Sequence, residues 1–494
     1  MSNFIIFPHQ LFENITNLQA SKKIYLLEHP IFFGYRQTKM NFNKKKLIMH
    51  RASMKCYEQY LKENTSAIII YINFNELLNS DICKIIKHPK ETISYYKPID
   101  YLLEEKLTNI NTTTTLEPLN FLTSDKEFEK YYETVKSKKK PFYQTGFYKW
   151  QRERLQILMK NGKPFGGKLT YDNDNRNPLP KNIKIPQIII PKWNKYIKEA
   201  IDYIEKNFPN NIGESDNFWC PINFKDAKLW FKYFLKDRLH NFGTYQDAIT
   251  EKNDIFIFHS GISCALNIGI LDPYYIIIQA IKYGEEHKIG INNIEGFIRQ
   301  ILGWREFSRF TYKYIYKEMT TINYFNAKYK MSSSFYNGKT GLLPLDVTIQ
   351  KAFKNGYLHH IERLMIVGSL TMMMGIHPND VYKWFMEFSV DSYDWVMINN
   401  VYSMALYSDG GLTTTKAYAA SSNYEMIRKS DFKKGIWQEI WDSLYWSFIG
   451  NNLDKMKKMG RFGPIQAKNW LNKTKEQKEK FKKISEKFIN INIL

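Results

Sequence analysis

Two adjacent histidines and a nearby arginine are the side chains in this sequence best suited to chemistry. His359 and His360 stand in the run GYLHHIERLM, and Arg363 follows them closely. Histidine changes its charge near neutral pH, so a pair beside an apolar segment suits proton transfer in a dry pocket. Helical spacing predicts that Arg363 shares a face with one or both rings. Taken alone, however, the run is more typical of a surface pair at the start of a helix.

The overall composition predicts a folded, basic protein with more than one domain. The chain has 494 residues, of which 44% are hydrophobic and 16% aromatic, and it is too long for one ordinary core. It carries 71 Lys and Arg against 49 Asp and Glu, a net charge of +22. This excess favours nucleic acid or an anionic membrane surface as a partner.

Neither a membrane span nor secretion is predicted. The chain contains no apolar run of about 18 residues, and its first eight residues are typical of a strand rather than a signal peptide. The cysteines have no CxxC spacing, which predicts buried thiols in a reducing compartment. They are Cys56, Cys83, Cys220 and Cys264. We therefore expect a cytoplasmic protein that is not secreted.

Three regions of the chain differ in composition and periodicity. Residues 1–130 alternate β-rich runs with helical stretches, as in a parallel-sheet α/β domain. Residues 131–215 are rich in Lys, Asn, Pro and Gly and predict an ordered interdomain connector. Residues 216–494 show helical periodicity and predict an all-α domain. The expected strands are Phe4–Pro8, Lys23–Leu27 and Ala67–Ile72, and the expected helices include Lys44–Lys62, Ala227–Leu239, Pro273–Tyr283, Ile291–Lys317, Pro344–Asn355, Arg363–Met374 and Pro378–Phe388.

One segment nearly matches a phosphate-binding P-loop. It reads GKPFGGKL over residues 162–169, but Leu169 stands where a Ser or Thr hydroxyl would hold magnesium. The preceding residues are also typical of a helix rather than a strand, so we exclude an NTPase. GxGxxG, HExxH and zinc-type Cys/His spacings do not occur either.

Three other stretches could line a binding site. Residues 242–248 (FGTYQDA) and 259–269 (HSGISCALNIG) offer hydroxyls and backbone N–H groups to a phosphate at a helix start. Residues 295–307 (EGFIRQILGWREF) place a polar stripe on an apolar helix. Residues 391–400 (DSYDWVMINN), with SDGG at 408–411, combine carboxylates, amides and a glycine-rich turn. Each stretch alone is more typical of a cap, a loop or a salt-bridged face.

The order of these stretches resembles the photolyase/cryptochrome superfamily. Together with HHIERLM and the later KAYAAS, they look like the bacterial (6-4) photolyases that usually carry an iron–sulfur cluster. The P-loop-like segment, and FNKKKL with HRASM over residues 42–54, are similar to other parts of the same family. The resemblance runs from about residue 4 to about residue 450.

This resemblance implies the photolyase fold: an N-terminal α/β, Rossmann-like antenna domain joined to an all-α, FAD-binding C-terminal domain. It implies a light-driven lyase that repairs UV-induced pyrimidine dimers by electron transfer, acting as a monomer on damaged DNA in a nucleoid or a viral or host DNA compartment. The FAD-binding residues by this similarity are Tyr245, Ser260, Ser263, Arg299, Gln300, Arg305, Asp391, Asp394 and Asn400.

The same resemblance assigns the reaction and the DNA contacts. His359 and His360 match the active-site pair of the family, and Asn400 matches the residue beside the reactive flavin ring. The expected DNA-binding residues are Arg363, Lys416 and Tyr418. Repair of a (6-4) lesion moves a hydroxyl between two bases, for which a protonated histidine can act as general acid. Opening a cyclobutane dimer needs no such proton, so the pair favours (6-4) lesions.

Departures from the family pattern affect three expected properties. The cluster cysteines of the family are replaced by Pro344, Lys433, Ile436 and Glu439, so we expect no iron–sulfur cluster and no other metal. In the electron relay Trp384 is kept, but Tyr336 and Phe385 replace Trp and Tyr. For a possible antenna chromophore, a ribityl-lumazine or another compound, the one ligand we name is Glu28.

Three alternatives stay open. The first is a photolyase for cyclobutane dimers, and the second is a cryptochrome-like blue-light photoreceptor without repair activity. The third is a basic structural DNA-binding protein, which would bind no flavin.

Overall fold

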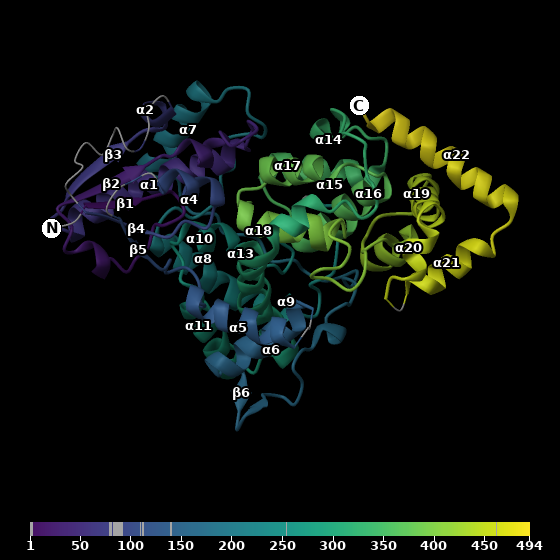
Figure 1. The fold of residues 1–494 in the computed structure, drawn as a ribbon, viewed down its shortest axis with the longest axis horizontal. Coiled ribbons are helices and arrows are strands. Elements are labelled where there is room, and N and C mark those ends of the chain that lie inside the picture. Colours follow the sequence, from purple (N-terminus) through teal and green to yellow (C-terminus); the bar gives the residue numbers. More distant parts are fainter. Residues whose placement is uncertain are drawn as a thin grey trace.

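The chain combines a parallel sheet near its N-terminus with a large helical region, as predicted (Figure 1). The computed structural model describes residues 3–78, 82, 92–108, 110, 113–138, 141–252, 254–460 and 462–494. The sheet lies at one end of the molecule together with α1, α2 and α7, helices such as α8, α13, α17 and α18 lie in the middle, and α19–α22 form the other end.

The sheet has five parallel strands in the order β3-β2-β1-β4-β5. They are β1 (Asn3–Ile6), β2 (Lys23–Leu27), β3 (Ile68–Ile72), β4 (Ile93–Tyr96) and β5 (Thr113–Leu116). Every residue of the central strand β1 is buried, as expected for a strand of a parallel sheet that is covered on both faces. Strands β4 and β5 are not among those expected from the sequence, and β5 lacks an apolar run because it reads TTTL.

The remaining elements are mostly helical. The helices are α1 (Lys44–Asn64), α2 (Phe74–Leu78), α4 (Tyr101–Leu107), α5 (Asp125–Ser137), α6 (Gln144–Leu155), α7 (Lys195–Asn207), α8 (Phe224–Asp237), α9 (Leu239–Phe242), α10 (Ser263–Ile268), α11 (Pro273–Glu286), α12 (Ile291–Ile298), α13 (Glu306–Thr321), α14 (Ser334–Asn337), α15 (Leu343–Asn355), α16 (Ser369–Met373), α17 (Pro378–Phe388), α18 (Asp394–Ile398), α19 (Trp437–Asn451), α20 (Leu453–Lys457), α21 (Gly463–Leu471) and α22 (Lys475–Asn492). Short 3-10 turns are η1 (Thr16–Leu18), η2 (Pro30–Phe33) and η3 (Asp172–Asp174), and π-helical segments are η4 (Arg299–Arg305), η5 (Glu362–Gly368), η6 (Asn399–Ala405) and η7 (Asn423–Ile427).

The segment predicted as a connector contains regular structure. Helix α7 packs against α1, where Glu199 accepts from Arg51 and the Arg51 guanidinium lies 3.5 Å from the centre of the Tyr203 ring. The P-loop-like residues form an antiparallel hairpin of β6 (Met159–Lys160) and β7 (Lys163–Pro164). A hairpin cannot supply the strand–loop–helix of a P-loop. The predicted domain boundaries stay a prediction.

Helix α1 joins the sheet region to the loop before α18. The buried Lys46 ammonium donates to the Ser392 carbonyl oxygen at 2.5 Å. His50 Nδ1 lies 3.0 Å from the Phe32 carbonyl oxygen and Nε2 lies 2.7 Å from the Tyr393 hydroxyl. Because a carbonyl can only accept, Nδ1 carries the proton and Nε2 accepts from Tyr393. These bonds fix the position of residues 391–393.

Acid is expected to destabilise the fold partly through His9. This ring is buried between Phe7 and Phe32, with centroid distances of 6.3 and 4.9 Å, and neither ring nitrogen has a hydrogen-bond partner. Burial lowers the pKa of His9 to about 3. The unfolded chain therefore takes up a proton below about pH 6.5 that the folded chain excludes, and stability falls as the pH falls.

The corresponding variant is His9→Phe. Between pH 7 and pH 5 the wild-type protein should lose about 2 kcal/mol more unfolding free energy than this variant. Urea unfolding at both pH values measures the difference. The variant His287→Gln, in an exposed ring, should follow the wild type; equal pH dependence in all three proteins would contradict the prediction.

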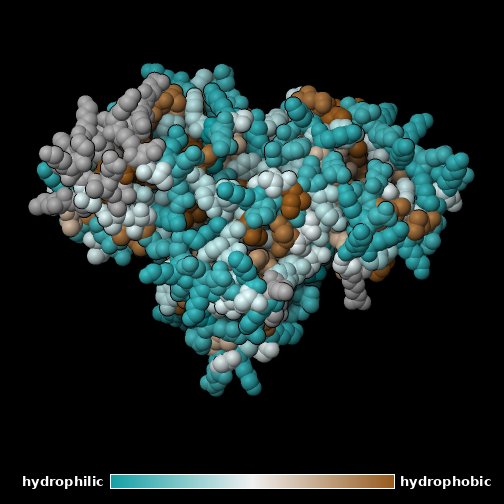
Figure 2. All heavy atoms as spheres, in the orientation of Figure 1, coloured by the Kyte–Doolittle hydropathy of each residue, from teal (hydrophilic) through white to brown (hydrophobic). Residues whose placement is uncertain are grey.

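The surface agrees with the basic, hydrophilic composition. Figure 2 shows hydrophilic residues over most of one face, with hydrophobic residues in small groups. In the described part of the chain no helix is long and apolar enough to cross a membrane.

Candidate functional site

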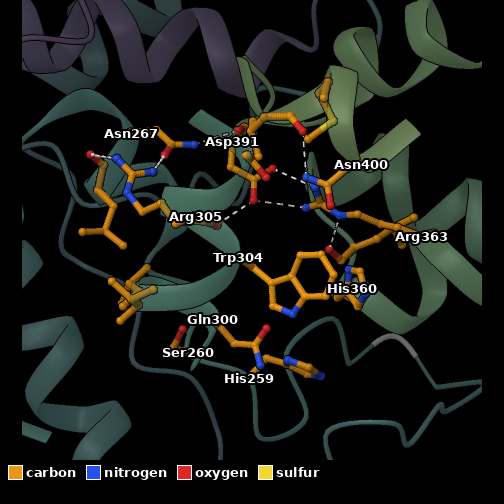
Figure 3. A pocket seen from close by; sticks show the side chains of 18 of the residues that line it. His259, Ser260, Asn267, Gln300, Trp304, Arg305, His360, Arg363, Asp391 and Asn400 are labelled. Carbon is orange, nitrogen blue, oxygen red and sulfur yellow. Dashed lines mark hydrogen bonds and ion pairs between the residues drawn. The ribbon is translucent and has the colours of Figure 1, made fainter. Parts of the chain in front are cut away.

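A cavity of about 250 Å³ opens among the central helices (Figure 3). Its wall combines aromatic side chains such as Trp304 and Trp395 with polar ones. The lining residues that the sequence analysis assigns are Ser260, Ser263, Gln300, Arg305, His360, Arg363, Asp391 and Asn400. Stretches that lie far apart in the sequence therefore meet around one space.

Three walls of this cavity are π-helical. Gln300 and Arg305 come from η4, Arg363 from η5 and Asn400 from η6. A π-helical turn is wider than an α-helical turn and redirects side chains, and such turns are frequent at functional sites. Gly368 lets η5 and η6 approach closely, since a Cβ added there would lie 2.8 Å from the Ala405 Cβ.

A buried ion pair occupies one end of the cavity. Arg363 NH1 and NH2 lie 3.0 and 3.2 Å from the two carboxylate oxygens of Asp391, a bidentate arrangement. The Ser263 hydroxyl donates to Asp391 at 2.6 Å, and the Ser389 hydroxyl donates as well. Burial alone would raise the pKa of Asp391, but the guanidinium and hydroxyls outweigh it and hold this pKa below its usual value. The carboxylate is therefore ionised at neutral pH.

The two adjacent histidines have different environments. Helical structure begins at His360, so His359 precedes the helix. The prediction that Arg363 shares a face with one or both rings therefore holds for His360 alone, since these two residues line the same cavity. The His360 ring faces the cavity and is exposed there, although the surrounding protein, followed by the charge of Arg363, lowers its pKa to about 4. The His359 ring is fully buried outside the cavity lining.

His259 lines the cavity although the sequence analysis assigns it no role. It precedes Ser260 in the run HSGISCALNIG, and membership of this donor-rich run is the signal that could have found it. The His259 ring stacks on His359 with a centroid distance of 4.7 Å and an interplanar angle of 10°.

Arg305 presents an unused donor at the other end of the cavity. Its guanidinium lies between the rings of Phe121 and Trp395, at 4.5 and 4.9 Å from their centroids. It donates to the Asn267 side chain and to the Asn120 carbonyl oxygen, whereas Nε is buried without a partner. Burial lowers the pKa of Arg305 to about 10, so the group remains cationic. A cation with a free N–H suits an anionic or carbonyl-bearing ligand.

Three residues assigned to FAD lie outside the lining. Arg299 pairs with Glu295 at 3.1 Å and with Asp172 at 3.2 Å. Asp394 accepts from the hydroxyls of Tyr312 and Tyr382 and lies 3.5 Å from Arg36. Tyr245 packs against Phe258, with ring centroids 5.7 Å apart. Their assignment to the cofactor stays a prediction.

The expected electron-relay residues form a row of rings leading from the cavity. Phe385 lines the cavity, and its centroid lies 5.3 Å from that of the buried Trp384. Phe353 lies 5.7 Å from Trp384 and 5.8 Å from Tyr336. The Tyr336 hydroxyl donates to Glu387 at 2.8 Å. The row contains both expected residues, and its use as a relay stays a prediction.

The expected DNA contacts lie in two places. All three are half-buried. Arg363 lines the cavity with Asp391, whereas Lys416 and Tyr418 lie outside its lining, with the ammonium 5.0 Å from the ring centroid. Lys416 also lies 6.0 Å from the ring of the exposed Phe462. These contacts place a cation among aromatic rings, an arrangement that suits nucleic acid.

Glu28, the expected antenna ligand, is fully buried and bonded to the protein itself. Its carboxylate accepts from Arg51 at 3.0 Å on both oxygens, from the Tyr71 hydroxyl at 2.5 Å and from the Phe74 amide at 2.9 Å. A carboxylate has about four acceptor positions, and all are used. An antenna chromophore at Glu28 stays a prediction that this arrangement does not support.

The described residues contain no group of three or more His, Cys, Asp or Glu able to hold a metal ion. The position of Ile436 is exposed and that of Pro344 is buried at the start of α15. Cys220 and Cys264 are buried thiols and Cys56 is half-buried, while Cys83 lies outside the described residues. The absence of a cluster stays a prediction.

Comparisons with known proteins show which fold the chain has. The family model for deoxyribodipyrimidine photo-lyase-related proteins matches residues 4–220. The fold is similar to a bacterial class III photolyase from Agrobacterium tumefaciens (TM-score 0.54, 16% identity, 99% of this chain and 96% of that one). It is also similar to a cryptochrome from Synechocystis sp. PCC6803 (TM-score 0.52, 16% identity, 99% of each chain). The chain thus has the photolyase fold.

A curated relative extends this assignment. The (6-4) photolyase of Agrobacterium fabrum (strain C58) is 34% identical over 331 residues, which cover 65% of this chain and 65% of that protein. The match therefore spans slightly less than two thirds of the relative's length. Together these findings identify the chain as a relative of the photolyase/cryptochrome superfamily, which confirms the resemblance seen in the sequence.

Proposed function

We propose that this protein is an FAD-dependent DNA photolyase whose substrate is the (6-4) photoproduct. The observation that carries this proposal is the cavity in which His360 stands open beside the Arg363–Asp391 ion pair. An imidazole that is exposed to a cavity is placed for proton transfer to a base bound there. Cyclobutane dimers need no such group.

The donor set of the cavity fits FAD. Its polar wall offers hydroxyls, amides and guanidinium groups to phosphates, ribityl oxygens and ring carbonyls, and its aromatic wall suits the flat ring system. The unpartnered Nε of Arg305 is a buried donor that a ligand would satisfy. The residues that would hold FAD from within the cavity are Ser260, Ser263, Gln300, Arg305, Asp391 and Asn400. Bound FAD supplies the light-driven transfer of one electron to the lesion and back.

The protein side chains supply position and protons. Asp391 is held ionised by Arg363 and two serine hydroxyls, and it fixes one wall of the cavity. His360 donates a proton to the hydroxyl that leaves the first base of the lesion. Its low pKa in the free protein means that the negative charge of bound DNA has to favour the protonated form.

Damaged DNA is the partner that the charge favours. A net charge of +22 supplies the attraction to phosphates. A damaged base pair stacks poorly, so its extrusion into a cavity costs less than that of a normal base. We expect the protein to act as a monomer and without an iron–sulfur cluster.

Illumination of defined lesions tests this function. The purified protein should show flavin absorbance and, after reduction, should restore an oligonucleotide that carries one (6-4) lesion under blue light. Restoration of only a cyclobutane dimer would assign the first alternative. Flavin absorbance without restoration of either lesion would assign a photoreceptor, and a colourless protein would exclude the whole proposal.

A further inference from the structure

The cavity wall contains a second histidine that comes from a distant part of the chain. His259 and His360 both line the cavity, whereas His359 does not. In Figure 3 His259 lies with Gln300 and Trp304 on the same side of the cavity as His360, away from Asn267 and Arg305. The pair of rings that can meet a substrate is therefore not the adjacent pair in the sequence.

The hydrogen bonding of His259 fixes its protonation pattern. Its Nε2 lies 3.1 Å from the carbonyl oxygen of Gln246. A carbonyl oxygen can only accept, so Nε2 carries a proton. In the neutral ring Nδ1 is then unprotonated and has no hydrogen-bond partner among the described residues. Burial, followed by the nearby rings of His359 and His360, lowers the pKa of His259 well below 6.5, so the ring is neutral at pH 7. His259 therefore offers a proton acceptor to the cavity.

His359 lies behind His259 and beside the buried ion pair of Glu362 and Lys351, and neither of its ring nitrogens makes a hydrogen bond among the described residues. Its ring is fully buried, and Nε2 lies 3.4 Å from Glu362 Oε2. The other oxygen of Glu362 accepts from the buried Lys351 ammonium at 2.9 Å, and Lys351 also donates to the Thr250 carbonyl oxygen. The His359 ring therefore reaches the cavity wall through the stacked ring of His259, whose centroid lies 4.7 Å away.

We propose that His259 is the proton acceptor of the reaction cavity, paired with His360 as donor, and that His359 is a positioning residue for His259. This inference rests on the proposed function. During (6-4) repair the C–O bond to the first base breaks, and the hydroxyl leaves as water with a proton taken from His360. The oxygen bonds to the ring carbon of the second base and loses one proton to Nδ1 of His259. Its other proton passes to the neighbouring ring nitrogen as the C–C bond between the bases breaks and the carbonyl forms, and the electron that bound FAD would supply returns to it. Transfer of the proton from His259 to His360 then restores the starting state.

Chemical labelling tests the geometry independently of repair. Diethyl pyrocarbonate modifies accessible, unprotonated imidazole nitrogens, and peptide sequencing separates the adjacent rings. In the dark at pH 7, His259 and His360 should react at least tenfold faster than His359. A single-stranded oligonucleotide with one (6-4) lesion should slow labelling of both rings and leave the exposed His287 unchanged. Labelling of His359 as fast as His360, or no protection of His259, would overturn the assignment.

Substitutions test the roles. His259→Gln keeps an amide able to donate but removes the proton acceptor, and it should lower (6-4) repair about 100-fold with flavin absorbance retained. His359→Ala removes the stacked ring and should lower repair, whereas His359→Phe restores the ring and should recover most of it. Unchanged repair in His259→Gln, or equal loss in both His359 variants, would contradict the proposal. If the wild type repairs neither lesion, the proposed function fails, while the labelling result still decides which rings face the cavity.

Discussion

Replacing Asp391 with asparagine is expected to lower the free energy of unfolding by about 3–5 kcal/mol. The substitution leaves the guanidinium of Arg363 buried without its countercharge, and the side chains of this pair are only 13% and 9% exposed. It also weakens the hydrogen bonds from Ser263 and Ser389. Chemical unfolding followed by circular dichroism measures the loss.

Two further variants show whether the lost stability comes from the broken ion pair or from any loss of a carboxylate. The double variant Asp391→Asn/Arg363→Met removes both charges and should recover much of the lost stability. The pair of Lys228 and Glu13 is 40% and 52% exposed, so Glu13→Gln should cost less than about 1 kcal/mol. A double variant no more stable than Asp391→Asn would contradict this account.

The loss should also depend on pH in a defined direction. The pKa of Asp391 is lowered in the folded protein, so its contribution is complete above the unfolded value of about 3.9. The contribution disappears as the pH falls through the folded value. The difference between wild type and Asp391→Asn should therefore be constant near neutral pH and shrink in acid.

Many helices and strands of the fold could be predicted from the sequence of short segments. The apolar strands Lys23–Leu27 and Ala67–Ile72 and the helix Pro378–Phe388 appear within a residue of the predicted limits. Proline at the start of α17 and periodic apolar positions mark that helix locally. Strand β5 could not be predicted in this way. Its threonines show no apolar pattern, and it is a strand because it pairs with β4, which lies earlier in the chain.

The direction in which individual side chains of the site point depends on π-helical turns and on long-range packing, which local sequence patterns do not predict. The helix predicted over Ile291–Lys317 is present, but its η4 segment is π-helical and changes which residues face the cavity. This change places Gln300 and Arg305 in the wall and leaves Arg299 outside it. His259 meets His359 only because two segments one hundred residues apart pack together. Spacing along one helix cannot predict such a contact.

Replacing His360 with alanine is expected to lower (6-4) repair by about 10²–10⁴-fold, the usual contribution of a general acid. The ring faces the cavity, and its removal takes away the donor without touching the Arg363–Asp391 pair. Flavin absorbance and light-driven reduction of the flavin should persist, because neither needs this proton. Loss of flavin from the variant would instead mean that His360 supports the cofactor, and unchanged repair would exclude it as the acid.

The pH dependence of repair distinguishes a proton donor from a residue that only shapes the cavity. Desolvation by the protein around the cavity, followed by the Arg363 charge, lowers the pKa of His360 to about 4, so the protonated form is a minority at neutral pH. Above its pKa the protonated fraction falls about tenfold per pH unit. At saturating DNA, the wild-type rate of (6-4) repair should therefore rise as the pH falls from 8 to 6, and the residual rate of His360→Ala should not change. Bound phosphates raise the pKa and shift this rise to higher pH, but they cannot reverse its sign. A wild-type rate that increases with pH would require the neutral ring to act, which is the role we assign to His259.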